Sequence, residues 1–205
     1  GQMSKFSADQ IAMFSPGQVA LFSTTQIQAL SGEQVSLVSN DQIRAMTVQQ
    51  INAVTSEQAK FITTESITAF TSAKIAALNV DTFAALSTDV IGALSTTPEA
   101  AGKPSQLTAV TAAQIAAMSE EQVQALTDGE DGQIAALTNK QLAAFTNDQL
   151  NAMSTDQIGS ITATQVIALT SSGDAGQLNV YFYDATSNNR KHLSLLTIIC
   201  NNLSK

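Results

Sequence analysis

Four consecutive eight-residue units decide the fold. They read S-P-G-Q-V-A-L-F over 15–22, S-T-T-Q-I-Q-A-L over 23–30, S-G-E-Q-V-S-L-V over 31–38 and S-N-D-Q-I-R-A-M over 39–46. Position 1 is Ser or Thr in nearly every unit, position 4 is usually Gln, position 5 is usually Ile, Val or Leu, position 7 is usually Ala, and position 8 is apolar. Eleven units run without a gap over 7–94, and further units start at Thr111, Ser119, Thr127, Thr138, Thr146, Ser154 and Thr162. A fixed short period of this length is typical of proteins that stack one repeat on the next.

Each unit carries the start signal of a helix. A Ser or Thr followed three residues later by Gln is a capping box, in which the hydroxyl accepts from the third helical N–H and the Gln side chain accepts from the cap's own N–H. The capping pairs that we single out are Ser23 with Gln26, Ser31 with Gln34, Ser39 with Gln42, and Thr47 with Gln50. Ten units also place Asp or Glu at position 3, in the first turn, where the helix dipole favours a negative charge.

The period excludes one continuous helix. Eight residues advance a helix by about 800°, so the apolar stripe would drift by about 80° per unit and no face could stay buried. A strand would put positions 5 and 8 on opposite faces, whereas a helix puts them on one face. The sequence therefore predicts an all-α solenoid of helices about six residues long, one per unit. We expect positions 1, 4, 5, 7 and 8 to face inward, and the recurring Gln to act either in the capping box alone or also in amide contacts between stacked units.

Three stretches interrupt the period between the capping hydroxyl and the Gln: 95–106, 127–133 and 170–177. All are rich in Gly, Pro, Ser or Asp, so we expect surface loops. The second loop holds Asp128, Glu130 and Asp131. Carboxylates on a Gly-containing turn are ligands that Ca²⁺ accepts, although solvated acids at a loop tip are the simpler interpretation. The predicted organisation is a cloning scar and lead-in over 1–6, the solenoid over 7–176, and a C-terminal cap or tail over 177–205.

The tail differs in composition from the repeats, because it holds both Tyr residues, the single His and the single Cys. Residues 178–184 predict a strand, residues 187–191 predict a turn, and residues 192–199 fit a strand or a short helix. We expect the tail to cover the open end of the solenoid, with Tyr181, Phe182 and Tyr183 as possible end contacts. A remnant of a following domain and a non-native tail are the alternatives.

Composition excludes several functions. The formal net charge is −8, which disfavours nucleic-acid binding because that needs a basic field. No apolar run approaches the length of a membrane span. With one His and one Cys in 205 residues, the chain has no disulfide framework, no recognisable zinc site and no nucleophile–base pair with an orienting third group. We therefore expect no catalytic residues, no cofactor and no enzymatic activity.

The unit S/T-x-x-Q-I/V-x-A-L resembles the short Ala-, Thr- and Gln-rich repeats of long, repetitive bacterial surface and adhesin-like proteins. The resemblance covers residues 7–169 and implies an extracellular or cell-surface stalk, adhesin spacer or filament component. Open solenoid ends expose core, so we expect end-to-end self-association. The alternatives are a recognition solenoid that binds a protein or glycan through its outer face, and ordering of water or ice by rows of Ser and Thr hydroxyls.

Overall fold

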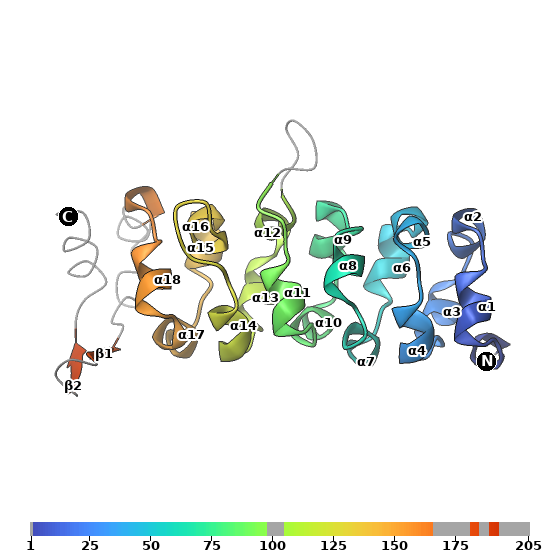
Figure 1. The fold of residues 1–205 in the computed structure, drawn as a ribbon, viewed down its shortest axis with the longest axis horizontal. Helices are drawn as coiled ribbons and strands as arrows, with labels where there is room; N and C mark the ends of the chain where they lie inside the picture. Colours follow the sequence, from blue (N-terminus) through green and yellow to red (C-terminus); the bar gives the residue numbers. More distant parts are fainter. Residues whose placement is uncertain (1, 98–104, 166–180, 185–188, 193–205) are drawn as a thin grey trace. The chain divides into compact units, whose positions relative to one another are not determined.

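A computed structural model describes residues 2–97, 105–165, 181–184 and 189–192 (Figure 1). The chain divides into two compact units, Gly1–Ala117 and Met118–Lys205. The predicted third loop at 170–177 lies outside the described residues.

The first unit is a series of short helices joined by turns, as the repeat predicts. Its elements are η1 (Gln2–Lys5), α1 (Ala8–Ala12), α2 (Pro16–Val19), α3 (Thr24–Gln28), α4 (Gly32–Ser36), α5 (Asn40–Ala45), α6 (Val48–Asn52), α7 (Ser56–Ala59), α8 (Thr64–Ile67), α9 (Ser72–Ala77), α10 (Val80–Ala84), α11 (Thr88–Gly92), α12 (Gln106–Ala109) and α13 (Ala112–Ala116).

The second unit continues the pattern and also contains a hairpin. Its elements are α14 (Glu120–Gln124), α15 (Gln133–Ala136), α16 (Asn139–Leu142), α17 (Asn147–Ala152), α18 (Thr155–Gly159), β1 (Tyr181–Asp184) and β2 (Asn189–His192). The strands pair antiparallel, with Tyr181 opposite His192 and Asp184 opposite Asn189. The strand prediction is confirmed over 181–184. The turn prediction is wrong for residues 189–191, which pair with residues 182–184; residues 178–180, 185–188 and 193–199 lie outside the described part.

The predicted capping boxes start the helices. Ser39 donates its backbone N–H to Gln42 Oε1 (2.8 Å), and the Gln42 N–H donates to Ser39 Oγ (3.3 Å). The boxes of Ser23, Ser31 and Thr47 have the same two bonds. Helix α5 ends at Ala45, and its C-cap Met46 has an extended ψ of 142°. Thr47 continues in the extended conformation before α6 begins. Each helix is therefore short because the next capping box restarts the chain after one or two turns.

The core is built from positions 5 and 8, with Gln at position 4 beside them. Ile43, Met46 and Gln42 are all buried, which confirms the inward orientation of these positions. The inward prediction for position 1 is wrong: Ser31, Ser39 and most other capping residues are exposed. The cap hydroxyl bonds the third helical N–H at the surface end of the helix, so it does not need the interior. Ala at position 7 is mostly half-buried.

Within the first unit, each helix from α1 to α10 packs against the third helix after it. The contacts join α1 to α4, α4 to α7, α7 to α10 and α10 to α13; α2 to α5, α5 to α8 and α8 to α11; and α3 to α6, α6 to α9 and α9 to α12. We call these three stacks column A, column B and column C, in that order. In the second unit, α14 packs against α17 in the same way. This regular stacking makes the chain a solenoid, and the fold class predicted from the sequence is confirmed.

Candidate functional site

The most regular polar feature of the molecule is a glutamine that binds at both ends of its amide. Gln50 Oε1 accepts from the Thr47 backbone N–H at 2.7 Å, which completes the capping box. Gln50 Nε2 donates to the carbonyl oxygens of Val19 (2.9 Å) and Phe22 (2.7 Å). We call this arrangement a glutamine bridge. It satisfies an orphan donor at the start of one helix and orphan acceptors at the end of another.

The bridge has a fixed register. Its acceptors are positions 5 and 8 of the unit four places earlier, 31 and 28 residues back in the chain. Gln106 keeps the same acceptors at 39 and 36 residues, because the loop before it adds eight residues. In the second compact part of the chain, Met118–Lys205, Gln157 donates to the carbonyls of Val123 (2.9 Å) and Leu126 (2.7 Å). The expectation of amide contacts between units is thus confirmed, with a backbone carbonyl as the partner.

The first three eight-residue repeats, which start at Ser7, Ser15 and Ser23, contain only half of the bridge. Gln10, Gln18 and Gln26 accept from the cap N–H groups of their own units. Within the described part of the chain, no carbonyl accepts from their Nε2 atoms. Gln10 and Gln18 are exposed. These amides leave oriented donors on the first three units of the array.

Four consecutive units replace the glutamine. Position 4 is Ser66, Lys74, Thr82 and Val90 in the units of α8 to α11. Thr82 Oγ1 still donates to the Val54 carbonyl (2.8 Å), whereas Ser66 turns its hydroxyl to the Thr63 carbonyl (3.1 Å) in its own unit. The regular bridge is therefore interrupted between residues 59 and 105.

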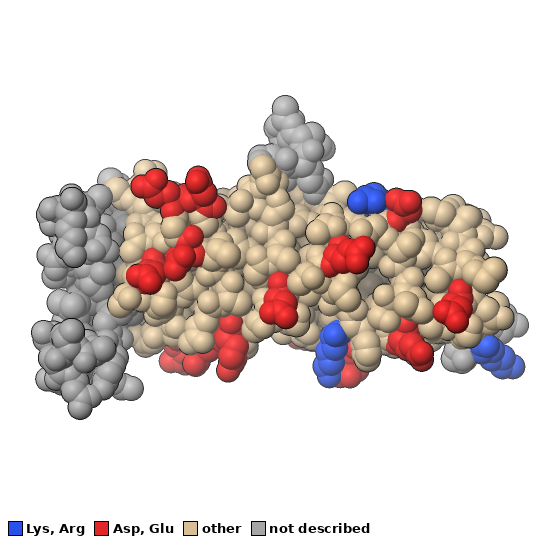
Figure 2. Space-filling view, in the orientation of Figure 1, with Lys and Arg blue, Asp and Glu red and all other residues tan. Residues whose placement is uncertain are grey.

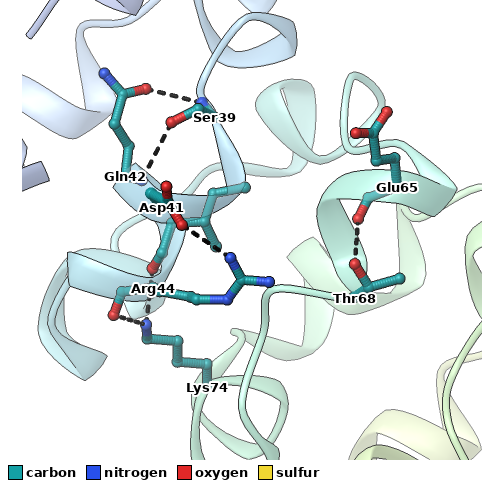
Figure 3. Close-up of polar contacts among 8 residues, drawn as sticks. Ser39, Asp41, Gln42, Arg44, Glu65, Thr68 and Lys74 are labelled. Atoms are coloured by element: carbon teal, nitrogen blue, oxygen red, sulfur yellow. Dashed lines mark hydrogen bonds and ion pairs between the residues drawn. The ribbon is translucent and has the colours of Figure 1, made fainter.

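Lys74 takes over the bridge with an ammonium group (Figure 3). It is 5 % exposed, and its Nζ donates to the carbonyls of Ile43 (2.7 Å) and Arg44 (2.8 Å) at the end of α5. The Arg44 guanidinium pairs with Asp41 at 3.0 Å, so the backbone and side chain of Arg44 bind oppositely charged groups. A cation at a helix C-terminus is electrostatically favourable.

The loop at 127–133 keeps both bonds of the capping box, and the described ends of the loop at 95–106 keep one of them. The Thr127 N–H donates to Gln133 Oε1 (3.1 Å), and the Gln133 N–H donates to Thr127 Oγ1 (2.9 Å) across the inserted residues. The Ser95 N–H likewise donates to Gln106 Oε1 (3.0 Å). In the second loop, Gly129 has φ +87° and donates its N–H to Ser160 Oγ at 2.6 Å. The loop at 127–133 is therefore an insertion into a repeat unit whose capping bonds survive, whereas after the loop at 95–106 Ser105 takes over as the N-cap of α12.

The sequence-predicted ligand and contact residues are not gathered into one site. Asp128, Glu130 and Asp131 are exposed, and the part of the chain that the structure describes contains no group of three His, Cys, Asp or Glu side chains suited to a metal ion. Tyr181, Phe182 and Tyr183 lie together on β1. None of the described helices has the length and apolarity needed to cross a membrane.

Position 4 also marks the edge of the apolar interior. A cavity of about 50 Å³ in the first unit is lined mainly by side chains of positions 5 and 8, among them Phe22, Ile51 and Phe70, with Gln58 and Ser66. Phe14 stacks edge-to-face on Phe22, with ring centroids 5.2 Å apart. On the surface, acidic groups outnumber basic ones over the visible face (Figure 2).

Comparison with known proteins places part of the chain among repeat proteins. A family model described as the ALTTAQ repeat matches residues 134–171. The six letters correspond to positions 7, 8, 1, 2, 3 and 4 of the unit; residues 136–141 read A-L-T-N-K-Q. No curated protein and no solved structure matches the chain. The chain is thus a repeat protein that contains a stretch similar to ALTTAQ repeats.

Proposed function

We propose that this chain is a structural repeat module of a bacterial extracellular or surface protein: a stalk, an adhesin spacer or a filament component. The observation that carries the proposal is the glutamine bridge, which recurs along the array and ties a unit to the unit four places earlier. A component with this role needs the turns of the array fastened to one another. The bridge provides that link, and Lys74 and Thr82 donate to carbonyls of earlier units where the glutamine is replaced. The resemblance to repeats of bacterial surface proteins supports the proposed location.

The short helices explain why such fastening is necessary. Helices of four to six residues are far below the length at which an isolated helix is stable in water. Their stability must come from neighbouring units, as in other solenoids. The bridge adds directional bonds to the apolar contacts of positions 5 and 8, so it fixes the register between turns. A fixed register favours a stiff module over a flexible linker.

We propose that end-to-end contacts between copies of the chain use the same glutamine bridge. Gln10, Gln18 and Gln26 present Nε2 donors whose counterparts in later units bind helix-end carbonyls. A second array that offers such carbonyls would complete the bridges without new chemistry. This contact would extend the array and make the chain a filament component.

Small-angle scattering coupled to size-exclusion chromatography tests the proposal. A spacer is expected to scatter as an elongated particle, and a near-spherical particle would refute the role. A filament component is expected to lengthen with concentration. Lengthening should disappear in a variant with Gln10→Leu, Gln18→Leu and Gln26→Leu. The matched control carries Gln28→Leu and Gln49→Leu, which change exposed glutamines outside position 4 and should leave the lengthening unchanged.

A second function is recognition of a protein partner through the outer face. The observation that favours it is the set of large apolar residues exposed at position 7, where most units carry Ala. Met13 is 82 % exposed, Leu21 84 %, Leu37 43 % and Phe61 45 %. Exposed apolar side chains that cluster mark interaction surfaces more often than scattered ones do.

A further inference from the structure

Column A carries two parallel rows of side chains on its outer face. Position 3 supplies a row of carboxylates, and position 7 supplies a row of large apolar side chains. The carboxylates are Asp9, Glu33, Glu57 and Asp81, and the apolar residues are Met13, Leu37 and Phe61. The two rows belong to α1, α4, α7 and α10 and their C-terminal turns, which stack consecutively. Residues four apart lie on one face of a helix, so the two rows run side by side.

Neither of the other columns combines these features. Column B has acids at position 3 of the units of α5, α8 and α11, but position 7 of these units is Ala. The α2 unit has the large Leu21 at position 7 but Gly17 at position 3. Column C has Thr25, Gln49 and Ala73 at position 3 and Ala at position 7. The pattern therefore recurs every 24 residues rather than every eight, which matches the spacing of stacked helices rather than that of the repeat unit.

One member of the apolar row, Phe61, is held in place by the packing beneath it. The Phe61 ring lies against α4 where Gly32 has no side chain: a Cβ at Gly32 would fall 2.0 Å from Phe61 Cε2. Phe61 remains 45 % exposed and Leu37 43 % exposed. Packing against α4 therefore fixes the Phe61 ring while part of the ring stays exposed. A side chain that is already ordered loses less conformational entropy when a partner binds to it.

Three of the four carboxylates in this row have no ion-pair partner among the described residues. Among the described residues, only Glu57 of the four has an ion-pair partner, namely Lys60 at 2.8 Å. The carboxylate row follows the apolar row over three stacked helices, α1, α4 and α7. A partner that buries the apolar row therefore gains most if it places cations beside it.

We propose that column A binds a basic amphipathic helix of a partner protein. Packed helices are about 8–10 Å apart, and seven residues of a helix rise about 10.5 Å. A helix lying along the column would thus present an apolar residue every seventh position to Met13, Leu37 and Phe61, with Lys or Arg flanking it. A second copy of this chain fits poorly, because its own column A would bring carboxylates against carboxylates.

The test uses a fluorescent peptide of about 21 residues, three heptads, with Leu at every seventh position and Lys on both sides. Fluorescence anisotropy should show saturable binding to the full chain that weakens as salt is added. Leu37→Ser with Phe61→Ser should weaken binding by about tenfold or more, as for anchor residues of other interfaces. Leu21→Ser, a more exposed apolar side chain on column B, should leave the affinity unchanged.

Charge variants distinguish binding at column A from a general attraction of the basic peptide to an acidic protein. Asp9→Asn with Glu33→Gln should weaken binding and flatten its salt dependence. Glu65→Gln with Asp89→Asn removes the same charge from column B and should not. Equal effects of the two pairs, no saturable binding, or dimerisation that is lost in the Leu37→Ser and Phe61→Ser variant would overturn the proposal. The inference rests on the recognition function and not on the spacer role, which scattering decides separately.

Discussion

Replacing Gln50 with Met removes one complete glutamine bridge while keeping a side chain of similar length. Gln50 is 2 % exposed, and its amide makes three bonds, to the Thr47 N–H and to the carbonyls of Val19 and Phe22. A buried polar group left without its partner costs about 1–3 kcal/mol. Allowing for the apolar gain of Met and for water reaching the Thr47 N–H, Gln50→Met is expected to lower the free energy of unfolding by about 3 kcal/mol.

Gln18→Met is the matched control. Gln18 makes the same capping bond, from the Ser15 N–H at 2.8 Å, but it is exposed and has no carbonyl partner within the described chain. Its loss should cost about 0.5–1 kcal/mol. The difference between the two variants, about 2 kcal/mol, isolates the bond between turns from the bond within a unit.

Urea unfolding followed by circular dichroism measures both variants. The denaturant slope should be the same in wild type and variants, so that midpoints report stability. If Gln18→Met and Gln50→Met destabilise the chain equally, the carbonyl bonds contribute nothing and the bridge reasoning is refuted. A Gln50→Glu variant should be less stable as pH rises through the range where the buried carboxyl ionises, because the carboxylate can no longer donate to the carbonyls.

Four further predictions concern other positions. Gly32→Ala should lower the free energy of unfolding, measured by thermal unfolding, by about 1–3 kcal/mol because the new methyl group overpacks against Phe61. The substitution should become neutral or stabilising in a Phe61→Ala background, and the same loss in both backgrounds would contradict the contact between Phe61 and Gly32. Lys74→Met should cost about 2 kcal/mol, whereas Lys74→Gln should restore the usual donor and stay within about 1 kcal/mol of wild type. Ser66→Gln should add the missing bridge and stabilise the chain by about 1 kcal/mol, measured as a higher urea midpoint. The Glu121 backbone N–H and the Ser119 hydroxyl hold the pKa of the Glu121 carboxyl below its usual value, so Glu121→Gln should be less stable than wild type at neutral pH. That difference should vanish as pH falls through the folded pKa of Glu121, and a pH-independent difference would exclude the carboxylate as its source.

The local structure could be predicted from the sequence because its determinants lie within one unit. Ser39 and Gln42 are three residues apart, and that spacing is sufficient to start a helix. The loop positions also follow from the sequence, since an insertion between Thr127 and Gln133 leaves the remaining positions of the unit in order. The strand over 181–184 followed from its aromatic content, whereas residues 189–191 looked like a turn because Asn, Arg and Lys carry little strand propensity.

The register between units could not be predicted in the same way. The acceptors of Gln50 are 28 and 31 residues away, and that distance depends on how many units complete a turn. Packing of the side chains at positions 5 and 8 decides this number, and no single unit contains that information. The rows of column A are hidden for the same reason: Met13, Leu37 and Phe61 are related only once helices three apart are known to stack.

Hydrogen exchange of the glutamine side-chain amides, measured by nuclear magnetic resonance, tests the bridge most directly. The Nε2 protons of Gln42, Gln50 and Gln58 should exchange slowly, because they are buried and bonded to carbonyls of an earlier unit. Those of Gln10 and Gln18 should exchange at the rate of a free amide. Fast exchange at all five residues would contradict the central claim that glutamine bridges join the turns of the array.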